Sequence, residues 1–351
     1  MKYQQATDGN RIWRFANGLS IRLCDIHVGL CLCTITLALA VVSLSSGTTD
    51  INLSDMVQML FGTARDHHQL YALWLVRLPH ILLGLMVGWC AALAGAILQP
   101  ITRNPLADPG LFGINQGAMT AIILLLVWAP AAPKLLVVLA GLCGGLTVVV
   151  ILHLLVGNKY AGGLAMLLMG LAVSSLLSAV STFLLLYLPT EMSLNLAGWM
   201  EGSLFQASWP LIVTFMPLFL FSLIGIMLAG PSLNRYQLGN ELALSLGEPV
   251  NYSRPLLMVF SALLCSASVT AVGPLAFLGI LAPHLADFLA APQGRARLFL
   301  SALMGGNLVI AADSLTKAAP AGVFLPIGLS FILIGVPLFI FTLWLRAHRI
   351  R

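Results

Sequence analysis

Charged residues are scarce in this chain of 351 residues. They make up 8% of the sequence, and hydrophobic residues make up 59%, whereas a soluble globular domain carries about 25% charged residues. This composition excludes a water-soluble globule. Because no polar linker divides the chain, we predict a single all-α, polytopic membrane domain over residues 1–351.

Carboxylates are missing from the centres of the apolar runs. All 12 Asp and Glu residues lie in loops or at the ends of predicted spans, although a proton- or ion-coupled carrier usually needs an ionisable group at membrane depth. A GxxxxGK[ST] phosphate loop is absent as well. Transport by this chain is therefore passive, coupled to Na⁺ through backbone carbonyls, or powered by a separate subunit.

Signatures of metal, redox and covalent chemistry are also missing. The 6 cysteines include no CxxC pair and lie in or beside apolar runs, which is typical of packing cysteines. The 7 histidines are dispersed, apart from adjacent His67 and His68 in a predicted loop. We therefore predict no metal site, no bound cofactor and no catalytic residue, which disfavours a membrane-embedded enzyme.

The chain does contain ten apolar runs, several of them shorter than the roughly 20 residues that a perpendicular crossing needs. They lie near residues 28–44, 73–98, 111–129, 134–156, 163–188, 209–229, 255–272, 274–290, 298–312 and 326–345. Residues 1–25 are polar and mildly basic, and the first run is long enough to span, so we expect no cleaved signal peptide.

An even number of spans places both termini on the same side of the membrane. With that side cytoplasmic, most Lys and Arg residues fall inside, as the positive-inside rule requires. The net charge of +5 then reflects topology and gives no case for nucleic-acid binding.

A break rich in glycine and proline interrupts the runs between Arg103 and Met119. Such a break is tolerated at membrane depth where protein or a water-filled cavity surrounds it. The tetrapeptide that begins at Asn104 (Asn-Pro-Leu-Ala) has a partial echo in the one that begins at Gly273 (Gly-Pro-Leu-Ala). Interrupted short segments in the two halves of a chain are typical of transporters, so transport is the first function that we expect.

The longest predicted cytoplasmic loop covers residues 230–255. Asn240 is a candidate N-cap of a short helix, and Gly247 is suited to end it. Leu242 and Leu246 share one face of this helix at i, i+4 spacing. We interpret the segment as a docking site for another protein, or alternatively as a surface loop that packs on its own chain.

A further set of motifs runs in order from about residue 73 to residue 340. The motifs are Arg77-Leu78-Pro79, Gly95-Ala96-Ile97-Leu98-Gln99, Arg103 to Pro109 with Gly113, Trp199 to Leu204, Leu238 to Gly247, Gly273 to Gly279 with Pro283-His284, Ala312-Asp313, and Leu325-Pro326-Ile327-Gly328. Together they resemble the iron-siderophore and cobalamin permease family of ATP-binding-cassette (ABC) importers. Within this resemblance, the residues expected to have a structural role are Asn104, Pro105, Pro109, Gly113, Gly273, Pro274, Pro283 and His284.

The resemblance implies a type II ABC importer permease fold with about ten transmembrane helices, in the inner membrane of a bacterium. It also implies a second permease subunit, identical or paralogous, around a shared pathway within the membrane lipid. Two cytoplasmic ABC ATPase subunits would bind ATP and Mg²⁺, and a periplasmic binding protein would deliver the substrate. We expect an iron-siderophore complex, with haem or cobalamin as the alternative cargo and a stand-alone secondary carrier as the rival mechanism.

By the same resemblance, Arg77, His80 and Lys317 face the binding protein, unless the two longer side chains simply extend to the membrane surface. The family usually has arginine where this chain has His80, so docking would be weaker or pH-dependent there. Asp287 likewise stands where the family often has arginine, and the sequence does not explain that departure.

The remaining implied sites are the coupling segment, the pathway and its gates. The resemblance assigns ATPase coupling to Leu238, Gly239, Glu241, Leu242, Ala243, Leu246 and Gly247, and the pathway to Ser174, Ser178, Ser181 and Thr182. It places an inner gate at Asn158 and Lys159 and an outer gate at Glu191, Trp199 and Glu201. Alternatively, the small residues near Ser174–Thr182 only allow close helix packing.

Overall fold

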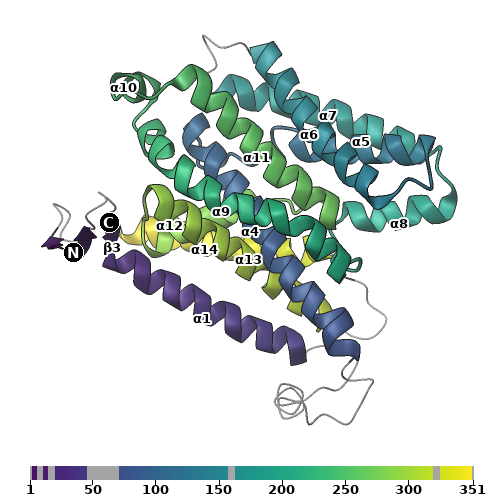
Figure 1. The fold of residues 1–351 in the computed structure, drawn as a ribbon, viewed down its shortest axis with the longest axis horizontal. Helices are drawn as coiled ribbons and strands as arrows, with labels where there is room; N and C mark the ends of the chain where they lie inside the picture. Colours follow the sequence, from purple (N-terminus) through teal and green to yellow (C-terminus); the bar gives the residue numbers. More distant parts are fainter. Residues whose placement is uncertain are drawn as a thin grey trace.

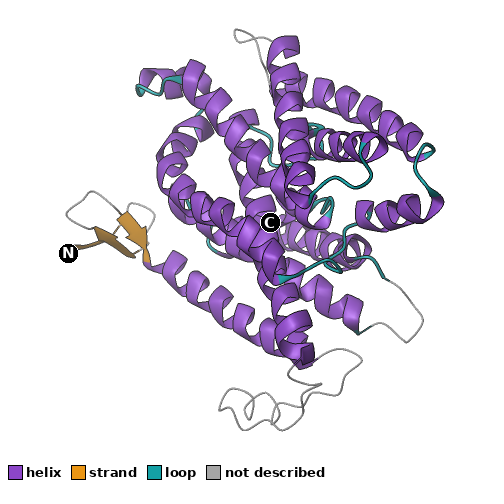
Figure 2. Ribbon diagram, turned by 45° about the vertical axis from the view of Figure 1, so that its right-hand side comes forward, coloured by secondary structure: helices purple, strands orange, loops and turns teal. Residues whose placement is uncertain are grey.

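The computed structural model describes residues 2–5, 11–14, 20–45, 71–156, 163–318 and 325–349. A small antiparallel sheet precedes the helices, with strands β1 (Lys2–Gln5), β2 (Arg11–Arg14) and β3 (Ser20–Arg22) in the order β1-β2-β3. Figure 2 shows this sheet at the edge of the molecule, at the start of the first helix. Residues 2–5, 11–14 and 20–22 thus form strands, although the all-α class was predicted for the whole of residues 1–351.

The rest of the described chain is helical (Figure 1). Its helices are α1 (Leu23–Ser45), the π-helical turn η1 (Ala72–Arg77) that continues directly into α4 (Leu78–Thr102), α5 (Ile114–Trp128), α6 (Lys134–Val156), α7 (Gly163–Leu185), α8 (Thr190–Met200), α9 (Trp209–Gln237), α10 (Asn240–Ser245), α11 (Val250–Val272), α12 (Leu278–Leu289), α13 (Gly294–Lys317) and α14 (Ile327–Arg349). Within the described residues, eight helices are long and apolar enough to cross a membrane, and α5 and α12 are shorter apolar helices. These ten helices match the ten predicted runs.

Helices α4, α11 and α13 form the centre of the bundle. Their membrane-length windows are 83%, 72% and 78% buried, whereas those of α1 and α7 are 11% buried. Helix α4 packs against α9, α11, α12 and α13. The two shorter helices, α5 and α12, also pack on this centre. The peripheral helices leave apolar side chains exposed for lipid or for another subunit.

The central pair, α4 and α13, meets through glycines. A Cβ atom built on Gly88 of α4 would lie 2.5 Å from the carbonyl oxygen of Gly305 and 2.9 Å from Cα of Gly306 on α13. Backbone atoms cannot move aside as a flexible side chain can, so only glycine fits. Close approach through small residues replaces the hydrophobic driving force that helices lack inside a membrane.

We expect Gly88→Ala to separate α4 from α13 and to lower the free energy of unfolding by about 1–3 kcal/mol, the usual cost of overpacking. Gly198→Ala in α8 is the matched control, because a Cβ there meets no atom within 4 Å and alanine favours a helix over glycine by up to about 1 kcal/mol. Thermal unfolding of the two purified variants measures the difference. Equal midpoints would contradict this account of the contact.

Candidate functional site

One end of the bundle carries a segment of exposed leucines between α9 and α11. We name Leu238, Leu242, Leu244 and Leu246 the leucine knob; these side chains are 54–58% exposed. Figure 1 shows α10, which carries part of the knob, projecting from the end of the bundle. Buried Ala243 holds the helix against its neighbours. The exposure of Leu242 and Leu246 agrees with the predicted docking surface, and Leu244 enlarges it.

The ends of α10 are set by two glycines. Gly239, with φ of 101°, is the N-cap, and no side chain caps the helix. The prediction of Asn240 as the N-cap is therefore wrong: Asn240 is the first helical residue, since glycine adopts this backbone conformation more easily. Gly247 ends the helix with φ of 79°. Its amide donates to Leu244 O at 2.9 Å in a Schellman motif, as predicted for this glycine.

Contacts on both sides fix the leucine knob to the bundle. The guanidinium of Arg235, near the end of α9, pairs with the buried carboxylate of Glu248. The hydroxyls of Tyr236 and Ser253 share a hydrogen bond of 2.8 Å that joins α9 to α11. Helix α9 runs through Gln237 and α11 begins at Val250, so the irregular segment is narrower than the predicted loop over 230–255.

The break before α5 folds into a series of tight turns. Arg103 has a left-handed backbone with φ of 52°, and the amide of Asn104 donates to Gln99 O at 3.1 Å. The side-chain oxygen of Asn104 accepts from the amide of Leu106 at 2.9 Å. Gly113, with φ of 79°, is the N-cap of α5, and Pro109 O accepts from the first amide of that helix. The exposed motif residue Pro105 lies within these turns.

Asp108 joins this break to the first turn of α12. Its buried carboxylate accepts hydrogen bonds from the amides of Gly110 and Gly279. Gly279 also lies directly against Gly95 of α4. The Gly-Pro break before α12 and the one before α5 are therefore neighbours in space.

The second break is held by backbone contacts. Gly273, at the C-terminus of α11, has φ of 81° and lies against the carbonyl of Trp199, and the half-buried Pro274 follows it. Within α12, Pro283 is buried, and His284 Nε2 shares a hydrogen bond of 3.0 Å with Thr342 Oγ1 of α14. His284 therefore ties α12 to α14, and Gly273 ties the end of α11 to α8.

Asp287 has a partner that the sequence did not reveal. Arg297 Nε lies 3.0 Å from Asp287 Oδ1, and Arg297 Nη2 donates to Asp287 Oδ2 at 3.1 Å and to Gln99 Oε1 at 2.6 Å. Gln99 Nε2 in turn donates to Gly279 O at 3.1 Å. This network joins α4, α12 and α13. The acidic residue at 287 is thus balanced by a cation ten positions later, across the turn from α12 to α13.

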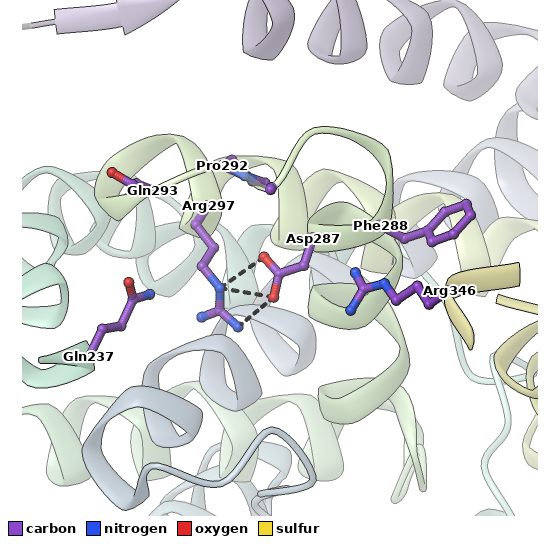
Figure 3. A pocket seen from close by; sticks show the side chains of 8 residues that line it. Gln237, Asp287, Phe288, Pro292, Gln293, Arg297 and Arg346 are labelled. Carbon is purple, nitrogen blue, oxygen red and sulfur yellow. Dashed lines mark hydrogen bonds and ion pairs between the residues drawn. The ribbon is translucent and has the colours of Figure 1, made fainter. Parts of the chain in front are cut away.

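The network borders a cavity of about 490 Å³ at the same end of the bundle as the leucine knob. Figure 3 shows Arg297 reaching Asp287 in the cavity wall, with Arg346 on the far side of Asp287 and Gln237 opposite. Two arginines and one carboxylate give this wall a net positive charge.

The three predicted docking residues lie together at the opposite end of the bundle. Arg77 is 5% exposed, and its guanidinium donates to the carbonyl of Leu44 at the end of α1. Lys317 Nζ lies 2.6 Å from Asp313 Oδ2 and also donates to Ser43 Oγ at 3.0 Å. Within this chain, two of the predicted docking cations therefore hold the end of α1.

His80 lines a small cavity with Asp313 and Lys317. Its Nδ1 donates to Val76 O at 2.7 Å, and the ring is half-buried. The imidazole of His80 therefore lies beside the ion pair of Lys317 and Asp313. Asp313 belongs to one of the motifs of the resemblance, but the sequence did not indicate that it lies beside His80.

The four polar residues predicted to line the pathway differ in their surroundings. Ser181 is buried and shares a hydrogen bond of 2.7 Å with Thr120 of α5. Ser174 is half-buried beside the break before α5, whereas Ser178 and Thr182 are exposed. Ser181 therefore serves helix packing, as the alternative interpretation held. The predicted inner-gate residues, Asn158 and Lys159, lie outside the described residues.

The predicted outer-gate segment is a short helix and a turn. Glu191 is exposed in the first turn of α8, and Trp199 near its end is buried. The carbonyl of the exposed Glu201 accepts from the amide of Gly328 at 3.2 Å, and Ser203 N donates to Val272 O at 2.7 Å. These bonds attach the segment to the ends of α11 and α14. Among the described residues, no group of three or more His, Cys, Asp or Glu side chains is placed to hold a metal ion.

Comparison with known proteins identifies the family. The FecCD transport family matches residues 35–345. This chain belongs to the FecCD transport family. As a FecCD permease it is a multi-pass membrane protein and a transport subunit.

Its relatives include permeases for several iron compounds. It is 31% identical to the iron(3+)-hydroxamate import system permease FhuG of Bacillus subtilis, over 86% of this chain and 92% of that protein. It is 31% identical to the Fe(3+) dicitrate transport permease FecD of Escherichia coli, over 88% and 96%. It is 33% identical to the hemin transport permease HmuU of Yersinia pestis, over 88% and 93%.

Two solved structures share its fold. A metal-chelate type ABC transporter in an inward-facing conformation matches with a TM-score of 0.79 and 25% identity, over 90% of this chain and 98% of that one. The PsaBC protein of Streptococcus pneumoniae, solved with a Fab, matches with a TM-score of 0.55 and 18% identity, over 82% and 95%. The fold is therefore that of an ABC importer permease.

The Arg297–Asp287 pair generates a test by double-mutant cycle. We expect Arg297→Leu and Asp287→Leu each to lower stability, because each leaves the partner's charge or hydrogen bonds unpaired at a cost of about 1–3 kcal/mol. The double variant should lose less than the sum of the two. Thermal unfolding of the four purified proteins measures the coupling, and strictly additive losses would show that the two side chains do not interact.

Proposed function

We propose that this FecCD permease takes up a ferric chelate of the siderophore type, and that ABC ATPase subunits dock on the leucine knob to supply the energy. The family and the relatives named above support a chelate importer. In this proposal the knob lies in the cytoplasm, and both termini lie on the same side of the inner membrane. The opposite end, around Lys317, faces a periplasmic binding protein.

The single observation that carries the proposal is the exposure of the knob. Four leucines, each more than half exposed, surround a six-residue helix at one end of the bundle. An exposed apolar patch of this kind marks a protein interaction site. Because a membrane buries apolar surface only within its hydrocarbon core, leucines beyond the end of the spanning helices need a protein partner.

The contacts beneath the knob suggest how motion reaches the membrane. The Arg235–Glu248 ion pair and the Tyr236–Ser253 hydrogen bond make α10 move with α9 and α11. Helix α11 packs on α4 at the centre of the bundle. A displacement of the knob by an ATPase would therefore tilt these helices as rigid bodies, which is the way packed helices change access to a central site.

Two observations support a large chelate as the transported compound: the cargo of the relatives and the lack of fixed charge along the spans. The named relatives carry iron hydroxamate, iron dicitrate and hemin. Carboxylates are absent from mid-span positions of this sequence, which suits large, weakly charged chelates rather than bare cations. A second permease subunit completes the pathway, and α7, whose membrane-length window is 11% buried, is available to line it.

Coupling is tested by Leu242→Asp combined with Leu246→Asp. Two buried carboxylates would oppose docking, so we expect loss of the co-purified ATPase and at least a tenfold fall in chelate-stimulated hydrolysis, about 1.4 kcal/mol or more of binding energy. Leu135→Asp, at an exposed leucine in the first turn of α6, is the matched control and should keep both. Normal hydrolysis and uptake of radioactive iron chelate by the double variant would refute the coupling role.

Docking at the opposite end is tested by His80→Arg. The added positive charge beside Lys317 should speed association with an acidic binding protein, by about fivefold if the charge contributes about 1 kcal/mol at the rim. Association rates at low and high salt provide the measurement, because the gain should shrink as salt screens it. Lys134→Gln, outside this cluster, should leave the rate unchanged. An unchanged rate for His80→Arg at low salt would exclude His80 from the docking surface.

A further inference from the structure

A groove of about 710 Å³ lies between α1, α9 and α13. Figure 1 shows α1 along the edge of the bundle, with its first turn near the sheet. Helix α1 packs mainly on α13, and Gly29 of α1 faces the groove with Leu300 Cδ2 as the nearest atom, 3.6 Å from its built Cβ. A glycine at this position leaves the groove wide enough for a chain of methylene groups.

The mouth of the groove is polar and its floor is apolar. Arg22 immediately precedes α1, Arg295 is in the first turn of α13, and Asn234 is in the last turn of α9, so all three lie at the same end of the bundle. The lining side chains deeper along these helices are apolar, among them Leu30 and Phe299. This change from charged to apolar along one groove matches the boundary between lipid headgroups and hydrocarbon.

An acidic residue, Asp25, lines the groove together with the two arginines. Asp25 is 7% exposed, and its Oδ1 has no hydrogen-bond partner among the described residues. The Arg295 guanidinium is held over the groove by a hydrogen bond of 2.9 Å to Met227 O, and Arg22 Nη1 donates to Ala291 O at 3.4 Å. The groove therefore combines two guanidinium groups at its mouth with one buried acceptor, Asp25 Oδ1, in its wall.

We propose that this groove binds one phospholipid with an ethanolamine headgroup. Its phosphate would lie between Arg22 and Arg295, and its ammonium group would donate to Asp25 Oδ1. One acyl chain would run past Gly29 and Leu30 into the apolar part of the groove. Basic pockets between helices at the membrane surface bind lipid headgroups in this way, and the buried carboxylate selects an amine-bearing headgroup over a purely anionic one.

Such a lipid would fill the space between α1 and α9. Most of α1 is exposed outside its contact with α13, and an acyl chain in the groove would connect it to the bundle through dispersion contacts. The inference concerns the membrane-facing surface and does not depend on the transported compound. Because the lipid would bind the folded chain and not the unfolded one, it would also raise the stability of the fold.

The test is native mass spectrometry of the full chain in detergent, supplied with equal amounts of phosphatidylethanolamine and phosphatidylglycerol. We expect the wild type to retain phosphatidylethanolamine in preference by about fivefold, the effect of one charge pair of about 1 kcal/mol. Asp25→Asn should abolish the preference while phosphatidylglycerol stays bound. Arg295→Gln should lower retention of both lipids by about fivefold.

Two further variants separate the groove from general effects on charge or folding. Gly29→Leu fills the groove without changing charge and should also lose both lipids, with its unfolding temperature in lipid-free detergent unchanged. Arg346→Gln removes a cation at the same end of the bundle but outside the groove, and should retain lipid as the wild type does. Free phosphoethanolamine, which has no acyl chains, should fail to compete at millimolar concentration.

Several outcomes would overturn the proposal. Equal retention of the two lipids by the wild type would remove the role of Asp25. Unchanged binding in Arg295→Gln and Gly29→Leu, or an equal loss in Arg346→Gln, would place the lipid elsewhere. Displacement by free phosphoethanolamine would indicate a headgroup site without an acyl chain, and a second copy of the chain replacing the lipid would identify a protein interface.

Discussion

A helix that stops inside a membrane must have its free backbone groups covered by protein, because lipid offers no hydrogen bonds. The fold of this permease depends on meeting that requirement twice. The breaks before α5 and α12 lie against each other, and Asp108 accepts from the amide of Gly279 while Gly279 lies on Gly95. Arg297 and Gln99 then join the same region to α13. Each break covers the other, which explains why both are surrounded by the most buried helices.

The buried central helices also determine where the surfaces for different partners lie. Helices α4, α11 and α13 are largely buried, and closely packed interiors transmit strain rather than absorb it. The leucine knob at one end and the cluster around Lys317 at the other are attached to these helices by ion pairs and hydrogen bonds. Exposed apolar helices such as α1 and α7 face lipid or another subunit. Energy, cargo and lipid would thus meet the chain at separate surfaces.

Much of this architecture could be predicted from local sequence. Hydropathy located the ten apolar helices, the Gly-Pro pattern located both breaks, and the spacing of Leu242 and Leu246 indicated the knob. Long-range partners could not be read in the same way. The residues around Asp287 in the sequence do not indicate that it pairs with Arg297. The sequence likewise gives no sign that Arg77 is buried against Leu44. The N-cap at Gly239 was missed because side-chain capping rules favour Asn240, whereas backbone conformation decided the outcome.

Helix α9 is longer than the hydrocarbon core of a bilayer is thick. A helix of 29 residues is about 44 Å long at about 1.5 Å per residue, whereas the hydrocarbon core of a bilayer is about 30 Å thick. Its final turns therefore extend past the acyl chains into the layer of hydrated phosphates and beyond. In the proposed orientation, a soluble partner would contact α10 without entering the bilayer, so assembly would require no insertion step.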